Sequence, residues 1–386
     1  MLSKIIFGFA LLGSLALLAW FWLAGPPTDQ ASHAAMVELS PKERLGKDIF
    51  FDPTLSTPPG QPCSECHAPD HGFTNLADEL PVSRGIHPDR FGNRNDMPAA
   101  YAGFGPPLHF DAKEGAYVGG NFWDGRANNL VEQAKGPFLN PLEMANPDEA
   151  AVVAKLRQAP YAPMFRRVFG EKSLEDVKQA YHFAAEAIAA YEMSAEVNRF
   201  DSKFDFYLKG QAVLSTSEKL GLEVFNDPKK GNCAACHPST PGPGGAPPLF
   251  TDFTYDNLGV PKNPVNPFYY LPPAFNPAGV GYVDPGLGEV VKKPSENGKF
   301  RVPSLRNVAL TKPYMHNGVF QSLRDVVMFY NTRDTGPWPA PEVAENVNRE
   351  ELGNLKLTVA EIDALVIFMH TLTDGHRPAA VSPPAR

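Results

Sequence analysis

Two copies of one short pattern carry the clearest chemistry in the sequence. The first joins Cys63, Cys66 and His67, and the second joins Cys233, Cys236 and His237. In such a C-x-x-C-H pattern the two thiols lie about one helical turn apart and can form thioethers to the vinyl groups of a haem, and the histidine is held as an axial iron ligand. Redox or zinc C-x-x-C sites are the alternative, but neither requires a histidine after each second cysteine. The four cysteines of the chain therefore predict two covalently bound haem c groups.

The two patterns belong to an internal duplication. Residues 40–46 (SPKERLG) recur as residues 215–221 (STSEKLG), and each copy contains the Ser-x-x-Glu capping box that opens a helix. Each half also closes with an amphipathic helix, the first expected to start at Ser173–Asp176 and the second at Thr358–Glu361. Helices at both ends of a haem motif are typical of a cytochrome c-like domain.

The predicted fold is therefore all-α, with two tandem cytochrome c-like haem domains. Residues 1–36 are expected to form a signal or anchor segment and linker, residues 37–198 the N-terminal haem domain, and residues 199–386 the C-terminal haem domain. The chain has 40 prolines and 32 glycines, and the stretch 238–294 shows neither helical nor strand periodicity. We expect it to form long ordered loops over the second haem.

The N-terminus predicts export. Residues 5–23 are an uncharged apolar run that ends near Trp20 and Trp22, longer than the roughly 7–15 residues of a secretory core and within the roughly 17–25 of a spanning helix. Lys4 on the short side predicts an N-terminus inside and the body outside the cytoplasmic membrane. Cleavage within residues 24–35 is the alternative, and both place the body in the periplasm. The net charge of −8, without a basic cluster, argues against a nucleic-acid partner.

Beyond these features, the chain resembles the bacterial di-haem cytochrome c peroxidase family, which includes the MauG enzymes. The resemblance runs from about residue 40 to the C-terminus and rests on four motifs, LGKDIFFDPTLS (45–56), GNRN (92–95), FWDGRANNLVEQAKGPFLNPLEM (122–144) and FRVPSLRNVALTKPYMHNGVFQSLRDVVMFYN (300–331). It implies a haem peroxidase that acts on hydrogen peroxide at the first haem.

The resemblance also implies roles for residues of the third motif. Trp123 matches the tryptophan between the haems and would conduct electrons, and Glu143 would be the acid and base for cleavage of the peroxide bond. Gln133 would donate a hydrogen bond in the pocket, and Pro137 would help to wall it. Such cleavage requires a group near the open iron site that moves a proton from one peroxide oxygen to the other.

Two further family features map onto the chain. Asn95, with the backbone carbonyls of Thr311 and Pro313, matches an inter-domain calcium site of oxygen ligands. A plain turn is the alternative. His87 lies where peroxidases with an electron-donor haem place a removable sixth ligand to the first haem, whereas MauG-type enzymes leave that iron open. His87 is therefore a candidate sixth ligand, with a solvated loop histidine as the alternative.

The ligand opposite His237 distinguishes the subgroups of the family. Donor-haem peroxidases carry methionine there, and the matching residue in this chain is Tyr330. On a helical wheel, Leu323, Val326, Val327 and Tyr330 share one face, and Met328 lies about 200° from Tyr330. A buried tyrosine with a satisfied hydroxyl is the alternative. A phenolate ligand lowers the iron potential and stabilises high-valent iron, which predicts the MauG-like arrangement of two high-valent haems linked through Trp123.

Three functions remain to be compared. The preferred one is a MauG-like peroxidase that oxidises a partner protein or another reductant. The second is a detoxifying peroxidase that draws electrons from a small cytochrome c or cupredoxin, and the third is a non-enzymatic di-haem electron carrier. A carrier needs neither a vacant iron site nor a pocket with Glu143 and Gln133. The sequence does not decide whether the anchor is cleaved, which redox partner the protein uses, or whether it forms a homodimer.

Overall fold

The computed structural model describes residues 38–75 and 80–377. Contacts group Leu39–Arg386 into one compact unit. The predicted anchor at residues 5–23 and its alternative cleavage region at 24–35 lie outside the described residues. Within the described part of the chain, no helix combines the length and apolar character that crossing a membrane requires.

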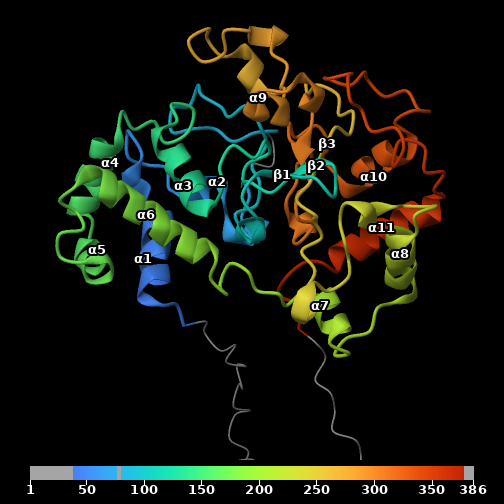
Figure 1. Cartoon of the computed structure of the whole chain (residues 1–386), viewed down its shortest axis with the longest axis horizontal. Coiled ribbons are helices and arrows are strands. Elements are labelled where there is room, and N and C mark those ends of the chain that lie inside the picture. Colours follow the sequence, from blue (N-terminus) through green and yellow to red (C-terminus); the bar gives the residue numbers. More distant parts are fainter. Residues whose placement is uncertain (1–37, 76–79, 378–386) are drawn as a thin grey trace, which may run out of the picture. The chain divides into compact units, whose positions relative to one another are not determined.

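The fold is helical, as the sequence predicts (Figure 1). The helices of the first half are α1 (Pro41–Phe50), α2 (Cys63–Cys66), α3 (Leu130–Leu139), α4 (Glu149–Gln158), α5 (Ala162–Phe169) and α6 (Val177–Glu192). Those that follow are α7 (Lys203–Leu208), α8 (Thr216–Asn226), α9 (Leu287–Val291), α10 (Leu323–Thr332) and α11 (Val359–His370). The predicted capping boxes open α1, α8 and α11. Helix α6 starts later than Ser173, because the Asp176 side chain accepts from the backbone N–H of Gln179 and caps the helix.

Two small antiparallel strand pairs add to the helices. Strand β1 (His109–Asp111) pairs with β2 (Ala116–Val118), and β3 (Tyr255–Asp256) pairs with β4 (Phe300–Arg301). An isolated bridge between Val118 and Thr254 connects the two pairs and thereby the two halves of the chain. The all-α prediction omits these strands, which are too short to show a two-residue periodicity.

The duplication is visible in the packing of the helices. Helix α1 packs on α6 in the first half, and α8 packs on α11 in the second. Each crossing depends on a glycine. A Cβ atom on Gly46 would lie 1.8 Å from the carbonyl oxygen of Ala187, and one on Gly221 would lie 2.1 Å from that of Ala364. Only glycine therefore allows the two backbones to approach this closely.

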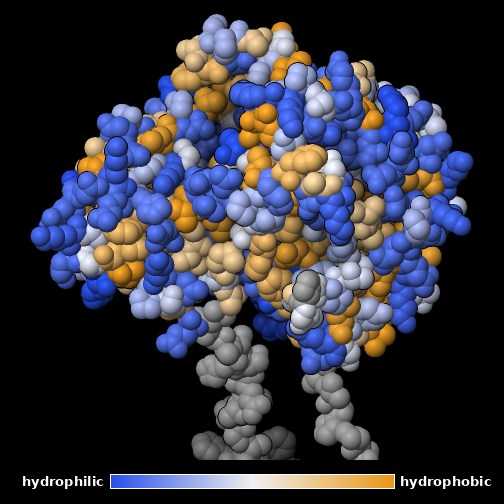
Figure 2. Space-filling view, viewed as in Figure 1, coloured by the Kyte–Doolittle hydropathy of each residue, from blue (hydrophilic) through white to orange (hydrophobic). Residues whose placement is uncertain are grey.

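Two large hydrophobic clusters lie on either side of the predicted domain boundary. One contains buried residues between Leu39 and Val197, and the other contains buried residues between Phe204 and Leu372. This separation supports the division at residue 198, which stays a prediction because contacts join both halves into one unit. The face seen in Figure 2 mixes hydrophilic and hydrophobic residues, so polar side chains cover the apolar interior over much of that face.

The loop-rich stretch 238–294 is ordered but is not confined to the second half. It includes α9 and several 3₁₀ turns. Phe268 packs in a small cluster with Phe91 and Leu142 of the first half, and Asn93 donates a hydrogen bond to the hydroxyl of Tyr282 over 3.2 Å. These loops therefore help to hold the loop that precedes Asn95.

Candidate active site

Each C-x-x-C-H motif opens onto a cavity of its own. Cys63, Cys66 and His67 line the first cavity, and Cys233, Cys236 and His237 line the second. The empty space at each site, open solvent included, is ≈ 1330 Å³ in the first cavity and ≈ 1720 Å³ in the second. The three residues of each motif therefore share the wall of one cavity.

The two motif histidines are oriented in the same way. The Nδ1–H of His67 donates to the carbonyl oxygen of Phe73 over 3.1 Å, and that of His237 donates to Phe250 over 2.8 Å. Such a bond fixes the tautomer and leaves Nε2 available to a metal. Burial lowers the pKa of His67 and lowers that of His237 to about 4, so both imidazoles are neutral, as iron ligation requires.

The cysteines fit thioether attachment. All four are free of disulfides, and burial raises the pKa of Cys63 and of Cys233 to about 12. Burial therefore keeps these thiols protonated in the absence of a bound metal. Together with the fixed histidines and the cavities, they fit two covalently attached haems.

Trp123 lies between the two cavities. It lines both, as do Asn95, Asp96, Pro98 and Arg301. The indole N–H donates to the carbonyl oxygen of Asn95 over 2.7 Å, and the backbone N–H of Arg301 donates to the carbonyl oxygen of Trp123 over 2.8 Å. Hydrogen bonds to backbone groups of both halves therefore fix Trp123, the residue that the sequence predicts to conduct electrons.

A buried arginine ties the two halves together beside Trp123. Arg94 donates two hydrogen bonds to Asp284, over 2.6 and 2.7 Å, and a third to Asp124 over 2.6 Å. Burial disfavours the charged form of Arg94 and by itself would lower its pKa. The attraction of Asp284 and Asp124 outweighs burial, so the pKa of Arg94 is raised. This network holds the loop that carries Asn95 against the second half.

The structure brings the predicted peroxide-site residues together in the first cavity. Gln133 and Pro137 lie on α3, and Glu143 follows in an irregular stretch, so all three line the cavity with His67. Asn129 caps α3, because its side chain accepts from the N–H of Glu132. This part of the predicted site is assembled from one continuous segment.

Glu143 has the protonation behaviour of an acid–base group. The Nδ2–H of Asn140 donates to its Oε1 over 2.7 Å. Burial raises the pKa of Glu143 to about 7, with a further rise from Asp96 and smaller opposing effects of Asn140 and Arg126. A carboxyl with this pKa can both accept and donate a proton near neutral pH.

His87 does not lie with these residues. It is part of a turn between Arg84 and Phe91, which form an isolated bridge, and its carbonyl oxygen accepts from the N–H of Arg90 over 3.1 Å. It is absent from the lining of the first cavity as the described residues form it. The structure therefore does not bring the predicted sixth ligand to the first haem site.

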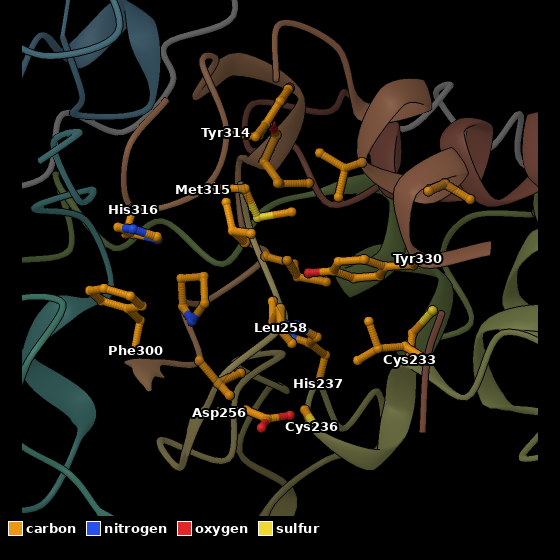
Figure 3. A pocket seen from close by; sticks show the side chains of 18 of the residues that line it. Cys233, Cys236, His237, Asp256, Leu258, Phe300, Tyr314, Met315, His316 and Tyr330 are labelled. Carbon is orange, nitrogen blue, oxygen red and sulfur yellow. The ribbon is translucent and has the colours of Figure 1, made fainter. Parts of the chain in front are cut away.

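The second cavity contains the predicted tyrosine. The four residues of the predicted face, Leu323, Val326, Val327 and Tyr330, line it, and Met328 instead packs in the neighbouring hydrophobic cluster. Figure 3 shows the Tyr330 ring and the His237 side chain extending into the same cavity. Tyr330 is partly buried, and among the described residues its hydroxyl makes no hydrogen bond, whereas that of Tyr314 in the same cavity donates to the carbonyl oxygen of Val308 over 3.0 Å.

Burial raises the pKa of Tyr330, with further rises from Cys233 and Cys236. A free phenol at this place is therefore neutral. Its ionisation requires a positive centre in the cavity, which an iron ion supplies.

The sequence analysis does not identify two of the residues that line the cavities. Met315 extends into the second cavity near Tyr330 (Figure 3), and its place inside the fourth family motif, residues 300–331, was the available signal. Asp96 lines both cavities, accepts a hydrogen bond from the Ser83 hydroxyl, and has a pKa that burial raises to about 7. It directly follows the GNRN motif.

The predicted calcium residues lie close together. The side-chain amide of Asn95 donates to the carbonyl oxygen of Pro313 over 2.6 Å, and Thr311 lines the same cavity. No group of three or more His, Cys, Asp or Glu residues that could hold a metal occurs in residues 38–75 and 80–377. The predicted calcium ligands Asn95, Thr311 and Pro313 belong to none of these residue types. Calcium binding at this place therefore has to be tested with calcium itself.

Comparison with known proteins agrees with these cavities. A family profile described as di-haem cytochrome c peroxidase matches residues 40–213. The methylamine utilization protein MauG of Paracoccus denitrificans is 42% identical over 86% of this chain and 88% of its own length. The cytochrome c551 peroxidase of Pseudomonas aeruginosa is 35% identical over 83% and 81%. The crystal structure of the diheme peroxidase BthA from Burkholderia thailandensis superposes with a TM-score of 0.76 at 35% identity, covering 91% of this chain and 90% of that one.

Proposed function

Because the chain belongs to the di-haem cytochrome c peroxidase family and is a di-haem peroxidase, we propose that it is of the MauG-like kind. In this proposal hydrogen peroxide reacts in the first cavity, and Tyr330 binds the iron of the second haem. The oxidising equivalents are then shared between the haems. The 42% identity to MauG supports this choice within the family.

The observation that carries the proposal is the free hydroxyl of Tyr330. The hydroxyl of Tyr314 in the same cavity is satisfied by the carbonyl oxygen of Val308. The Tyr330 hydroxyl has no partner in the described chain and extends into the space with His237 (Figure 3). A metal ion between the phenol oxygen and the imidazole would satisfy both.

The side chains of the first cavity supply the proton chemistry. Cys63, Cys66 and His67 would hold a haem whose iron would supply the electrons for cleavage of the peroxide bond. Glu143 would accept a proton from one peroxide oxygen and return it to the other, which would leave as water once the haem has supplied two electrons. Gln133 orients the peroxide through its amide, and Pro137 excludes water from one side of the pocket.

Trp123 is proposed as the route between the haems. Its indole lines both cavities, and its N–H is held by the carbonyl oxygen of Asn95. A large aromatic ring held in one orientation gives a shorter electronic path than the aliphatic side chains around it.

The detoxifying alternative needs a sixth ligand that closes the first iron at rest. The cavity lining formed by the described residues does not include His87, so the open site of the MauG-like enzymes is favoured. The electron source is then a small redox protein or a protein substrate. We also propose export to the periplasm from the apolar run at residues 5–23.

Calcium is proposed at the junction of the halves. Asn95 and Pro313 are in hydrogen-bond contact, and Thr311 lies at the same cavity wall. An amide rotation would present the Asn95 oxygen beside two carbonyl oxygens, a ligand set that suits Ca²⁺. The ion would stabilise the contact beside Trp123.

The test replaces Tyr330 with phenylalanine. This removes one oxygen, and we expect the electron paramagnetic resonance signal of the second haem to change and its reduction potential to rise. Tyr314→Phe is the matched control, because it removes a hydroxyl from the same cavity that donates to Val308. An unchanged signal in the Tyr330 variant would contradict the proposal, and loss of the signal in Met315→Leu instead would assign the ligand to Met315.

A further inference from the structure

A third carboxyl, besides Glu143 and Asp96, lines the first cavity, and it has no partner among the described residues. Glu192 is the last residue of α6 and is 6% exposed. Its side chain faces the cavity that Cys63 and His67 line. Its Oε2 is buried without a hydrogen bond, and the described residues offer the carboxyl no ion pair. A buried carboxyl in this state is costly unless it stays protonated or gains a charge to pair with.

The duplication shows that the fold does not require a carboxyl here. Gly46 contacts Ala187 and Tyr191 in the first half, and Gly221 makes the equivalent contacts with Ala364 and Phe368 in the second. The residue after each aromatic is therefore equivalent, which pairs Glu192 with Met369. Met369 is 7% exposed and lines the second cavity. An apolar side chain thus fills this position in one half, and an acid fills it in the other.

Within residues 38–75 and 80–377, no cation pairs with Glu192. On the neighbouring helix α1, Lys42 pairs with Glu186 over 2.9 Å and Lys47 pairs with Glu196. Burial alone accounts for the rise of the Glu192 pKa to about 8. The groups on which its charge acts are Cys63, at the haem attachment, and Tyr191 on the same helix, and it raises the pKa of both.

Other charged groups near α6 are also occupied or distant. On α4, Lys155 donates to the Ser56 carbonyl oxygen and to the side chains of Thr57 and Asn146. Glu132 on α3 accepts from the backbone of Asn128 at the exposed end of that helix. Glu143 and Asp96 line the same cavity but do not contribute to the shift of the Glu192 pKa. The charge that would act most directly on Glu192 is therefore that of a group bound in the cavity.

We propose that Glu192 is a redox-linked protonation site of the first haem, with no counterpart at the second. When the first haem loses one electron to an external acceptor, the Glu192 carboxyl releases one proton to solvent. The carboxylate left behind balances the positive charge gained by the haem. When the electron returns, the proton returns. The inference rests on the proposed attachment of a haem at Cys63, Cys66 and His67.

The direction in which the potential of the first haem changes with pH follows from the charges of the haem and of Glu192. An added positive charge favours the ionised carboxyl and lowers its pKa in the oxidised state. Between the pKa values of the oxidised and reduced states, the potential of the first haem therefore falls as the pH rises. When one proton accompanies one electron, the potential falls by at most about 59 mV per pH unit. The second haem, which has Met369 at this place, lacks this contribution.

The experiment is a pH-dependent redox titration of the two-haem protein, with each haem followed by its own spectroscopic signal. Glu192→Gln keeps the shape without the charge, and Glu192→Met copies the second half. We expect both variants to lose the pH dependence of the first haem near pH 8 and to raise its potential at higher pH. Glu186→Gln, on the outer part of the same helix, is the matched control and should keep the pH dependence.

Each outcome decides the inference. Equal pH dependence in the wild type and in Glu192→Gln overturns it. Should the variants fail to bind haem, infrared difference spectra of the wild type decide: a carboxylic C=O band that disappears on oxidation and shifts with ¹³C-glutamate supports the inference, and its absence overturns it. A wild type without a haem at the first motif would instead refute the proposed function.

Discussion

Replacement of Glu143 by glutamine tests the proton chemistry of the first cavity. The variant keeps an oxygen that can accept the hydrogen bond from Asn140, which lies 2.7 Å from Oε1 in the wild type, but it can neither take nor return a proton. General acid–base catalysis contributes about 10²–10⁴-fold. At about 1.36 kcal/mol per tenfold, this loss corresponds to about 2.7–5.4 kcal/mol of transition-state stabilisation.

The assay is rapid mixing of the diferric protein with hydrogen peroxide, followed by haem absorbance over a range of pH. The pKa of Glu143 is about 7. Because the ionised form accepts the first proton, the wild-type rate constant should rise as the pH increases towards 7 and level off above it. Glu143→Gln should lose this dependence together with the rate. Glu132→Gln, an exposed change on α3, is the control. A Glu143→Gln rate within threefold of the wild type would refute the assigned role.

Three further results are expected. Asn140→Leu removes the hydrogen bond that lowers the pKa of Glu143, so the midpoint of the rate–pH profile should move to higher pH, and an unmoved midpoint would contradict this. Arg94→Ala leaves Asp284 buried without its cation, whereas Asp124 keeps its ion pair with Arg126, and denaturant unfolding should show a loss of about 3–5 kcal/mol; a loss below 1 kcal/mol would show that the network is dispensable. Removal of calcium with a chelator should lower the thermal midpoint, and added calcium, but not magnesium, should restore it; no change on chelation would argue against the site.

The sequence predicts those parts of the molecule that depend on local pattern. The capping boxes at Ser40, Ser215 and Thr358 form as expected, because each depends on residues three apart in the chain. The face of α10 that carries Tyr330 also follows from helical periodicity alone. The attachment cysteines lie at their cavities because each motif contains both thiols and the histidine.

The remainder depends on contacts between distant segments. Asp96 and Glu192 become cavity residues only when the loop after GNRN and the end of α6 meet at the first motif. The packing of Phe268 against Phe91 joins residues that no periodicity relates. His87 is the opposite case. Its position relative to the GNRN motif predicts a place at the first haem, but it lies outside the cavity lining that the described residues form.

The central claim is that both haems share the oxidising equivalents of peroxide through the Tyr330-ligated site. The most direct test adds one equivalent of hydrogen peroxide to the diferric protein and records the near-infrared and electron paramagnetic resonance spectra. We expect a near-infrared charge-resonance band and loss of the ferric signals of both haems. No reaction until one haem has been reduced would contradict the account and would favour a donor-haem peroxidase whose first iron is closed at rest.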